Sequence, residues 1–460
     1  MIGVLPLARS TFDVPLSEKF LERMLGVLEG TGYAIGGPRR LLMDQETTRA
    51  AIAELKQAPV SQVLVLQISF TDAAAMVEIA NAFDKPLSIW AVPEPRTGGK
   101  LRLNSFCGLN LAGHALGLSG REFGYLYADP QSSGIEQAVK ELLTGKRLGM
   151  SVAARPAQTG DPAGRAAARS LRGARIGRLG AHPDGFDTCS YDKAKLRELA
   201  NVTVDELDIT ELFDAARREK ADASASLREK VAPTLTGLDQ VDQEQLDRSL
   251  SLKGALDRIR DTGAYDAFAI RCWPETFTEY GGAVCGPVAM MGEARVPCAC
   301  EADVYGALTS LLLQKVAGQP AFLTDLVDLD ESDNTGVVWH CGQAPLSMAD
   351  PDAMPRAAIH NNRRMPLLYE FPLKPGRVTF FRLSQAKGKP MAVIGGGEML
   401  KRPLAFNGTS GVVRFDSGSK AVLERIMGAA LEHHMALAYG DHRAMLEAAA
   451  AELGLPVLVL

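Results

Sequence analysis

The chain has 460 residues, of which 46% are hydrophobic and 23% charged, and 50 basic against 55 acidic residues give a net charge of −5. A chain of this length exceeds one compact core and predicts two to four domains, while the weak net charge excludes a general attraction to nucleic acid or to anionic membranes. No apolar run reaches roughly 18 residues and no basic region opens the chain, so we expect no membrane span, no signal peptide and a cytoplasmic location.

The first part of the chain alternates apolar runs with amphipathic stretches. Strands and helices are predicted in turn at 1–7, 16–30, 48–58, 61–69, 72–83 and 85–94. This alternation is typical of βαβ units and predicts a doubly wound domain with a mainly parallel sheet, which we place at residues 1–155.

A second α/β domain is expected at residues 156–320. The stretch 146–181 is rich in Pro, Gly, Ala and Arg and is interpreted as a linker or hinge that ends in a strand at 174–181. Helices are predicted at 191–201 and 208–223, and a strand at 265–275 carries Trp273 at its end. A last long helix is predicted at 302–316.

From residue 321 to residue 460 the pattern becomes β-rich. Short apolar stretches such as TGVVWHCG, GRVTFFRLS, KPMAVIGGGEM and SGVVRFDSG are separated by turn residues, which predicts an antiparallel, barrel-like domain. Helices at 419–440 and 442–454 and a strand at 455–460 are expected to close the chain.

Two carboxylates stand at the start of the helix predicted at 302–316. Glu301 and Asp303 are two residues apart, so they cannot point the same way and only one is expected to face a site. Asp303 suits the first position of a helix, where a carboxylate meets free backbone N–H groups, and we interpret it as a cap. Glu301 follows a strand-like stretch, and the carboxyl end of a parallel strand is where α/β folds bind ligands. We therefore expect Glu301 to be functional.

Four further residues are candidate ligands. Asp325 is one of five acidic residues in AFLTDLVDLDESDNTG, a pattern typical of a solvated loop, but it lies beside the predicted domain junction, where a cleft is expected. His340 ends the strand-like GVVWH, a position more typical of a buried structural histidine than of a ligand. His433 and His434 are adjacent near the end of a predicted helix, where successive side chains point about 100° apart, so at most one of them is expected to serve a given site. Carboxylates and imidazoles together suit Mn²⁺, Mg²⁺ or a similar ion with open positions.

The seven cysteines do not form a metal or disulfide pattern. Their number is odd, and neither Cys298/Cys300 nor Cys272/Cys285 has C-x-x-C spacing. We interpret them as reduced, buried thiols.

Three stretches resemble the L-fucose isomerase and L-arabinose isomerase superfamily. LNLAGHALGLSGREFGYLYAD (109–129) is similar to an N-terminal segment of arabinose isomerases, CACEADVYGALT with Asp325 24 residues after Glu301 resembles the paired acidic ligands of fucose isomerases, and the segment that begins HHMALAYG is similar to the C-terminal His-His segment of both. The first loop, ARSTFD, departs from the Gly-Ser-Gln stretch of arabinose isomerases.

The resemblance implies a metal site and its ligands. Glu301 and Asp325 would bind Mn²⁺, or another divalent ion such as Mg²⁺ or Co²⁺, and one of them would move a proton. His433 or His434 would be the third ligand, with the choice open. Substrate contacts are expected from His340, Asn110, His114 and Trp273. The related enzymes imply a homo-oligomer with sites near subunit contacts.

These features predict a metal-dependent aldose–ketose isomerase that acts on a free or modified monosaccharide through an enediolate. A carboxylate would carry the proton between neighbouring carbons, and Glu301 beside an apolar helix is expected to have a pKa raised by desolvation. Two alternatives stay open. One is an epimerase or lyase on a sugar acid, which Arg-rich pocket loops would favour, and the other is a sugar-binding protein without activity.

Overall fold

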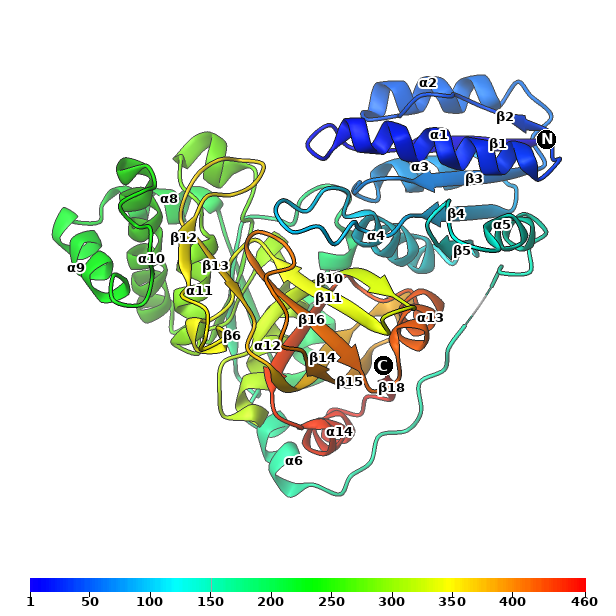
Figure 1. Ribbon diagram of the computed structural model, residues 1–460. Helices are drawn as coiled ribbons and strands as arrows, with labels where there is room; N and C mark the ends of the chain where they lie inside the picture. The colour runs from blue at the N-terminus through cyan, green and yellow to red at the C-terminus, as the bar shows by residue number, and fades with distance from the viewer. Residues whose placement is uncertain (150) are drawn as a thin grey trace.

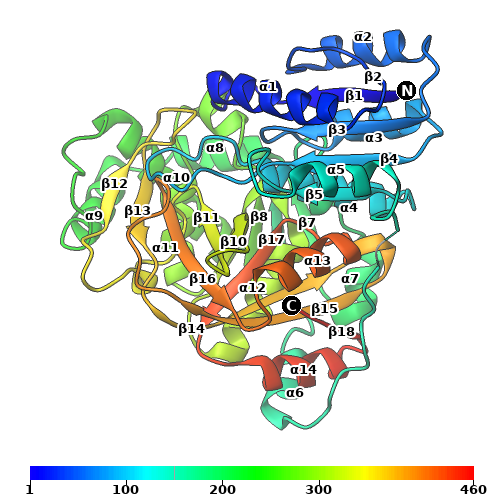
Figure 2. The same ribbon diagram turned by 45° about the vertical axis from the view of Figure 1, so that its right-hand side comes forward.

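The computed structural model describes residues 1–149 and 151–460, and the chain folds around three β-sheets (Figure 1). The N-terminal sheet and its helices stack above the C-terminal β-structure in both views (Figure 2). No helix among the described residues is both long and apolar enough to cross a membrane.

The N-terminal sheet has five parallel strands in the order β2-β1-β3-β4-β5. Its central strand β3 is buried along its whole length, as expected for a parallel sheet that is covered on both faces. The elements of this part are β1 (Ile2–Leu7), α1 (Val14–Gly30), β2 (Ile35–Gly36), α2 (Gln45–Leu55), β3 (Gln62–Gln67), α3 (Ala74–Ala82), β4 (Leu87–Ala91), α4 (Ser105–Leu118), β5 (Gly124–Tyr127) and α5 (Ile135–Leu143).

The middle sheet has four parallel strands in the order β7-β6-β8-β9. Its last strand leads directly into helix α12, so this sheet delivers the turn that carries Glu301. The elements are α6 (Pro162–Arg169), β6 (Arg175–Leu179), α7 (Lys193–Ala200), β7 (Thr203–Leu207), α8 (Ile209–Arg217), α9 (Ala221–Val231), α10 (Gln243–Gly263), β8 (Ala267–Ile270), α11 (Cys285–Glu293), β9 (Cys298–Ala299) and α12 (Val304–Ala317).

The third sheet is mixed and largely closed. Six of its strands form an antiparallel ring, because β16 pairs with β15 as well as with β11, and the ring continues through β10, β17 and β14. The elements are β10 (Phe322–Asp330), β11 (Thr335–His340), β12 (Arg356–Ala358), β13 (Leu368–Pro372), β14 (Gly376–Ser384), β15 (Met391–Met399), β16 (Thr409–Phe415), α13 (Ser419–Ala429), β17 (His434–Tyr439), α14 (Arg443–Glu452) and β18 (Val457–Val459).

This architecture confirms the predicted fold class of two parallel α/β units followed by an antiparallel barrel. Helix α12 is the link between them, because it packs against β8 of the middle sheet and against β14 and β17 of the barrel. Its side chains are buried almost all round, which explains why the segment is apolar on every face.

Three predicted elements differ from the structure. The expected linker contains helix α6, which packs against α14 and is seen beside it in both views (Figure 1, Figure 2). The acidic stretch around Asp325 is strand β10 and not a loop. The helix predicted at 419–440 ends at Ala429, where Ala430 adopts a left-handed conformation, and the chain resumes as strand β17. The prediction that His433 and His434 lie on a helix is therefore wrong.

Candidate metal centre and active site

Strand pairing in the barrel brings four of the candidate ligands together. β10 lies between β11 and β17, and Asp325 stands directly opposite His434 on one side and Trp339 on the other. His340 follows Trp339 at the end of β11, and His433 immediately precedes β17. Residues far apart in the chain thus meet because they occupy neighbouring positions across one sheet.

Glu301 reaches the same point from the middle sheet. It lies in the short turn between β9 and α12, where Glu301 and Ala302 both have positive φ, 51° and 55°. This left-handed backbone conformation is costly for residues other than glycine and is often found at functional sites. It turns the chain sharply before Asp303, the residue that begins the helix.

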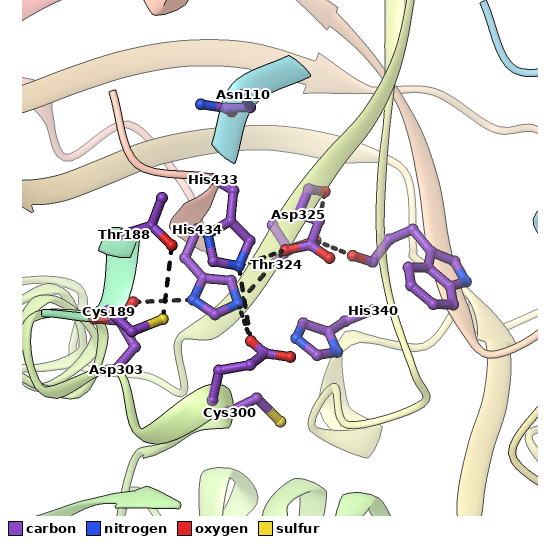
Figure 3. A network of polar contacts seen from close by, with 12 residues as sticks. Asn110, Thr188, Cys189, Cys300, Asp303, Thr324, Asp325, His340, His433 and His434 are labelled. Atoms are coloured by element: carbon purple, nitrogen blue, oxygen red, sulfur yellow. Dashed lines mark hydrogen bonds and ion pairs between the residues drawn. The ribbon is translucent and has the colours of Figure 1, made fainter. Parts of the chain in front are cut away.

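The carboxylates and imidazoles converge at short range (Figure 3). The Nε2 atom of His434 lies 3.0 Å from Oε2 of Glu301 and 3.5 Å from Oδ1 of Asp325. The Nε2 atom of His433 is farther from the same two oxygens, at 3.7 and 3.9 Å. Ligand atoms of Glu301, His340 and His434 also lie within 4.8 Å of one another.

These atoms fit a cation. Oε2 of Glu301, Oδ1 of Asp325 and Nε2 of both His340 and His434 are buried, and none has a hydrogen-bond partner of good geometry among the described residues. Buried polar atoms are normally satisfied, so four unsatisfied atoms that face one point indicate a missing ligand. Two carboxylate oxygens and two imidazole nitrogens are a donor set that suits Mn²⁺ and related divalent ions.

Asp303 holds one of these imidazoles in place. Its side chain accepts a hydrogen bond from Gly306 N at 2.8 Å, which confirms the predicted helix cap. It also lies 2.9 Å from Nδ1 of His434 and forms a fully buried ion pair with Arg382 at 2.5 Å. This contact with Nδ1 orients the ring so that Nε2 of His434 faces Glu301 and Asp325.

The two acidic candidates have opposite pKa shifts. Burial raises the pKa of Asp325 to about 7, with the charge of His434 opposing and that of Glu301 adding to the shift. Burial also acts to raise the pKa of Glu301, but the close imidazoles of His433 and His434, with a further contribution from His340, outweigh it and hold the pKa well below its ordinary value. The expectation that desolvation raises the pKa of Glu301 is therefore wrong, because two imidazoles stand beside this carboxylate.

The three histidines also differ. Burial lowers the pKa of His340 to about 3 and, together with the charge of His434, lowers that of His433 to about 4, so both rings are neutral. Burial acts in the same direction on His434, yet its contacts with Asp303, Cys189 and Glu301 raise its pKa well above the usual value. Since His434 is fully buried and His433 borders a cavity, the two adjacent rings face different surroundings.

A cavity of about 170 Å³ opens in front of these residues. Glu301, Asp325, His340 and His433 line its floor, and the predicted contact Trp273 lines its wall and donates from Nε1 to Oε1 of Glu301 at 3.3 Å. All three parts of the chain contribute to the lining: the N-terminal sheet through the loop after β1 and the segment before α4, the middle sheet through Phe186 and Trp273, and the barrel through the loop after β12.

The sequence analysis missed three cationic side chains at this cavity. Arg9 follows β1, Lys100 precedes α4, and Arg363 belongs to the β12–β13 loop. Burial lowers the pKa of Arg9, with Asp72 opposing and Arg363 adding to the effect, and Arg363 and Lys100 together contribute to a pKa of about 4 at His360. Arg9 lies in ARSTFD, the loop that departs from the arabinose isomerase pattern. This departure was the sequence signal that could have identified Arg9 as a residue of the cavity.

Asn110 and His114 lie behind the site. They are buried in α4, where Asn110 donates to Leu431 O at 2.7 Å and His114 lies 2.9 Å from Ala430 O through Nδ1. These contacts hold the segment that precedes His433, and neither residue lines the cavity. Asn104, at the start of α4, does line it, and its buried Oδ1 has no partner among the described residues.

Comparisons with known proteins cover both ends of the chain. The family model described as "Fucose/sulfoquinovose isomerase, N-terminal domain" matches residues 3–151, and "L-fucose isomerase, C-terminal domain" matches residues 338–460. The second match includes His340, His433 and His434, and the first includes Arg9 and Lys100.

Three relatives that carry the name sulfoquinovose isomerase align with nearly the whole chain. The one from Clostridium sp. (strain MSTE9) is 29% identical over 445 residues, which cover 96% of this chain and 94% of the relative. The one from Priestia megaterium (strain ATCC 12872 / QMB1551) is 28% identical over 437 residues, with coverage of 95% and 94%. The one from Alkalicoccus urumqiensis is 26% identical over 441 residues, with coverage of 95% and 94%.

The fold, the matched segments at both ends and relatives aligned along the whole length agree with the resemblance inferred from the sequence. The chain belongs to the fucose isomerase-like superfamily and is a sugar isomerase, an intramolecular oxidoreductase.

Proposed function

We propose that this enzyme interconverts the aldose and ketose forms of an acidic monosaccharide, with sulfoquinovose as the first candidate, and that it requires Mn²⁺ or another divalent ion. The observation that carries the proposal is the convergence of four unsatisfied buried ligand atoms below a cavity that bears three cationic side chains.

Glu301, Asp325 and His434 are the proposed ligands, with His340 as a fourth. His434 is preferred to His433 because its Nε2 lies closer to both carboxylates and because Asp303 orients the ring. A divalent ion bound here would polarise the carbonyl and hydroxyl oxygens of the sugar and favour loss of the proton between them. His433 borders the cavity as a neutral ring and is placed to contact a sugar hydroxyl.

Asp325 is the proposed proton carrier. A general base works best when its pKa is near the operating pH, and in the metal-free protein the pKa of Asp325 is about 7, whereas Glu301 stays ionised at lower pH. Trp273 and Phe186, whose rings are 5.5 Å apart, give this part of the cavity an apolar wall that limits the access of water.

Arg9, Lys100 and Arg363 are proposed to bind the acidic group of the substrate. Guanidinium groups pair well with tetrahedral anions through several N–H donors. Arg-rich pocket loops were expected to favour an epimerase or lyase on a sugar acid, and they indicate an acidic substrate; the relatives, however, are named as isomerases of sulfoquinovose, a sugar that carries a sulfonate. The two observations together favour an isomerase whose substrate is acidic. A homo-oligomer and a cytoplasmic location stay predictions.

The test is to chelate the purified protein, add back Mn²⁺ and measure aldose-to-ketose conversion of sulfoquinovose, L-fucose and L-arabinose. We expect conversion that depends on metal and is greatest for sulfoquinovose, and loss of both metal binding and conversion in Glu301→Gln. Metal-dependent conversion of only the neutral sugars would overturn the assignment of an acidic substrate. Full activity in the chelated protein would overturn the metal requirement, and epimerised product would move the reaction to the alternative class.

A further inference from the structure

A cysteine lies against the pair of histidines on the side away from Asp325 and His340 (Figure 3). Ligand atoms of Cys189, His433 and His434 are all within 4.8 Å of one another, and all three residues are buried. Figure 3 shows Cys189 and Asp303 on one side of the His434 ring, with Asp325 and His340 on the other. The proposed function assigns no role to Cys189.

A second observation concerns the His433 ring. Its Nδ1 is buried without a hydrogen-bond partner among the described residues, and the residue is only 4% exposed. Its Nε2 is the nitrogen near Glu301 and Asp325. Buried polar atoms are normally satisfied, and a buried thiol grouped with two imidazoles is a donor set that can bind an ion.

The two groups of donors differ in chemical character. Glu301, Asp325 and His340 offer hard and borderline donors, which suit Mn²⁺ or Mg²⁺, while Cys189 adds sulfur, which selects Zn²⁺, Cd²⁺ and other thiophilic ions. His433 and His434 are within reach of both groups.

We propose that Cys189, His433 and His434 form a second ion site that binds a thiophilic divalent cation such as Zn²⁺ or Cd²⁺. Binding forms a bond between the cation and the sulfur of Cys189, breaks the S–H bond and releases that proton to solvent. Occupation of this site draws both rings toward Cys189 and away from Glu301 and Asp325. Zn²⁺ and Cd²⁺ therefore compete with Mn²⁺ and inhibit the enzyme, a consequence that rests on the proposed function, whereas the binding itself does not.

The first experiment measures binding without any substrate. Metal-free full-length protein is titrated with Cd²⁺, and the ultraviolet absorption of cadmium–thiolate charge transfer is recorded. We expect one equivalent of Cd²⁺ to produce the band, and we expect Cys189→Ser to weaken this binding at least tenfold. Cys298→Ser is the matched control, because Cys298 is also a buried thiol but does not belong to the group that Cys189 forms with His433 and His434; it should bind Cd²⁺ as the unsubstituted protein does.

The second experiment tests competition. Added Mn²⁺ should move the Cd²⁺ titration to higher concentration, and Zn²⁺ should inhibit the Mn²⁺-loaded enzyme at least tenfold less well in Cys189→Ser. Absence of the charge-transfer band in the unsubstituted protein would overturn the proposal whether or not the variant folds. An equal band in Cys189→Ser would also overturn it. In protein shown by calorimetry to bind Mn²⁺, a Cd²⁺ titration indifferent to Mn²⁺ would overturn the competition between the two ions. If no sugar is isomerised, the absorption titration still decides the question.

Discussion

At the scale of single residues, the site depends on how neighbouring groups shift the pKa values of its two carboxylates in opposite directions. Glu301 has two imidazoles beside it and is held ionised, whereas Asp325 is dominated by burial and has a pKa of about 7. Similar pairs of acids elsewhere take different roles when their surroundings push their pKa values apart. The sequence placed both residues in the site but could not rank them, because the imidazoles that decide the ranking lie more than a hundred residues away.

The affinity for Mn²⁺ should decrease as the pH decreases. In the metal-free protein, Asp325 is protonated below about pH 7 and His434 carries a proton there as well, and these protons must leave before the atoms can bind an ion. We expect the Kd for Mn²⁺ to rise by up to about tenfold per pH unit for each proton as the pH falls from about 8 to about 6. Calorimetry in two buffers of different ionisation enthalpy checks this, and a Kd that does not change with pH would contradict it.

Substitutions of the two adjacent histidines should affect Mn²⁺ binding and kcat/KM differently. His434→Gln removes a proposed ligand and is expected to weaken Mn²⁺ binding by about 100-fold or more. His433→Gln changes a ring that borders the cavity, so we expect Mn²⁺ binding within a few-fold of normal but a lower kcat/KM. Calorimetry together with steady-state kinetics distinguishes the two. The reverse pattern would make His433 the ligand.

At the scale of elements, the start of α12 depends on one buried ion pair. Asp303 and Arg382 are each 1% exposed at the side chain, and Asp303 also caps the helix and orients His434. Arg382 lies on β14, so the pair ties α12 to the barrel at the position where His434 enters the site. Burial of one charge without its partner is costly.

Arg382→Met should therefore destabilise the protein and disturb the metal site together. We expect the free energy of unfolding to fall by about 3–5 kcal/mol and Mn²⁺ binding to weaken by about 10-fold to 100-fold, measured by urea unfolding and calorimetry. Arg49→Met is the control, since Arg49 pairs with Glu78 at the surface with 60% of its side chain exposed, and such pairs contribute less than about 1 kcal/mol. Equal effects of the two variants would contradict a special role for Arg382.

At the scale of the whole molecule, the active cavity exists only where the three parts of the chain meet. The barrel and the middle sheet bring the ligands, and the N-terminal part brings Arg9 and Lys100. The proposed acidic-group subsite is thus assembled by packing between domains, a common location for binding sites.

Substitution of the cationic residues should raise KM without loss of metal. For Arg9→Met and Arg363→Met we expect KM for sulfoquinovose to rise by about 10-fold to 100-fold, because each loss removes charge-assisted hydrogen bonds worth roughly 1.5–3 kcal/mol. The Kd for Mn²⁺ should stay within a few-fold. Arg39→Met is the control, since Arg39 pairs with Glu29 at the surface and does not line the cavity. A KM that stays unchanged in both cavity variants would remove the acidic-group assignment.

Sequence reasoning recovered the elements with strong periodicity better than those that depend on distant partners. Apolar runs such as β3 and the alternation of strands and helices in the first part were predicted because their pattern is local. Strand β17 was assigned to a helix, because MALAY after the paired histidines is apolar enough for either element and only pairing with β10 and β14 makes it a strand.

The sequence by itself determined the fold class, the superfamily and the residues Glu301, Asp325, His433 and His434 as candidates, since periodicity and short motifs are properties of local chain segments. Tertiary structure decided which imidazole faces the carboxylates, which acid has the raised pKa, and that Arg9, Lys100 and Arg363 share one cavity. These outcomes depend on burial and on charges brought together across sheets and domains. No local pattern encodes such contacts, because they arise only when the folded chain removes the groups from water.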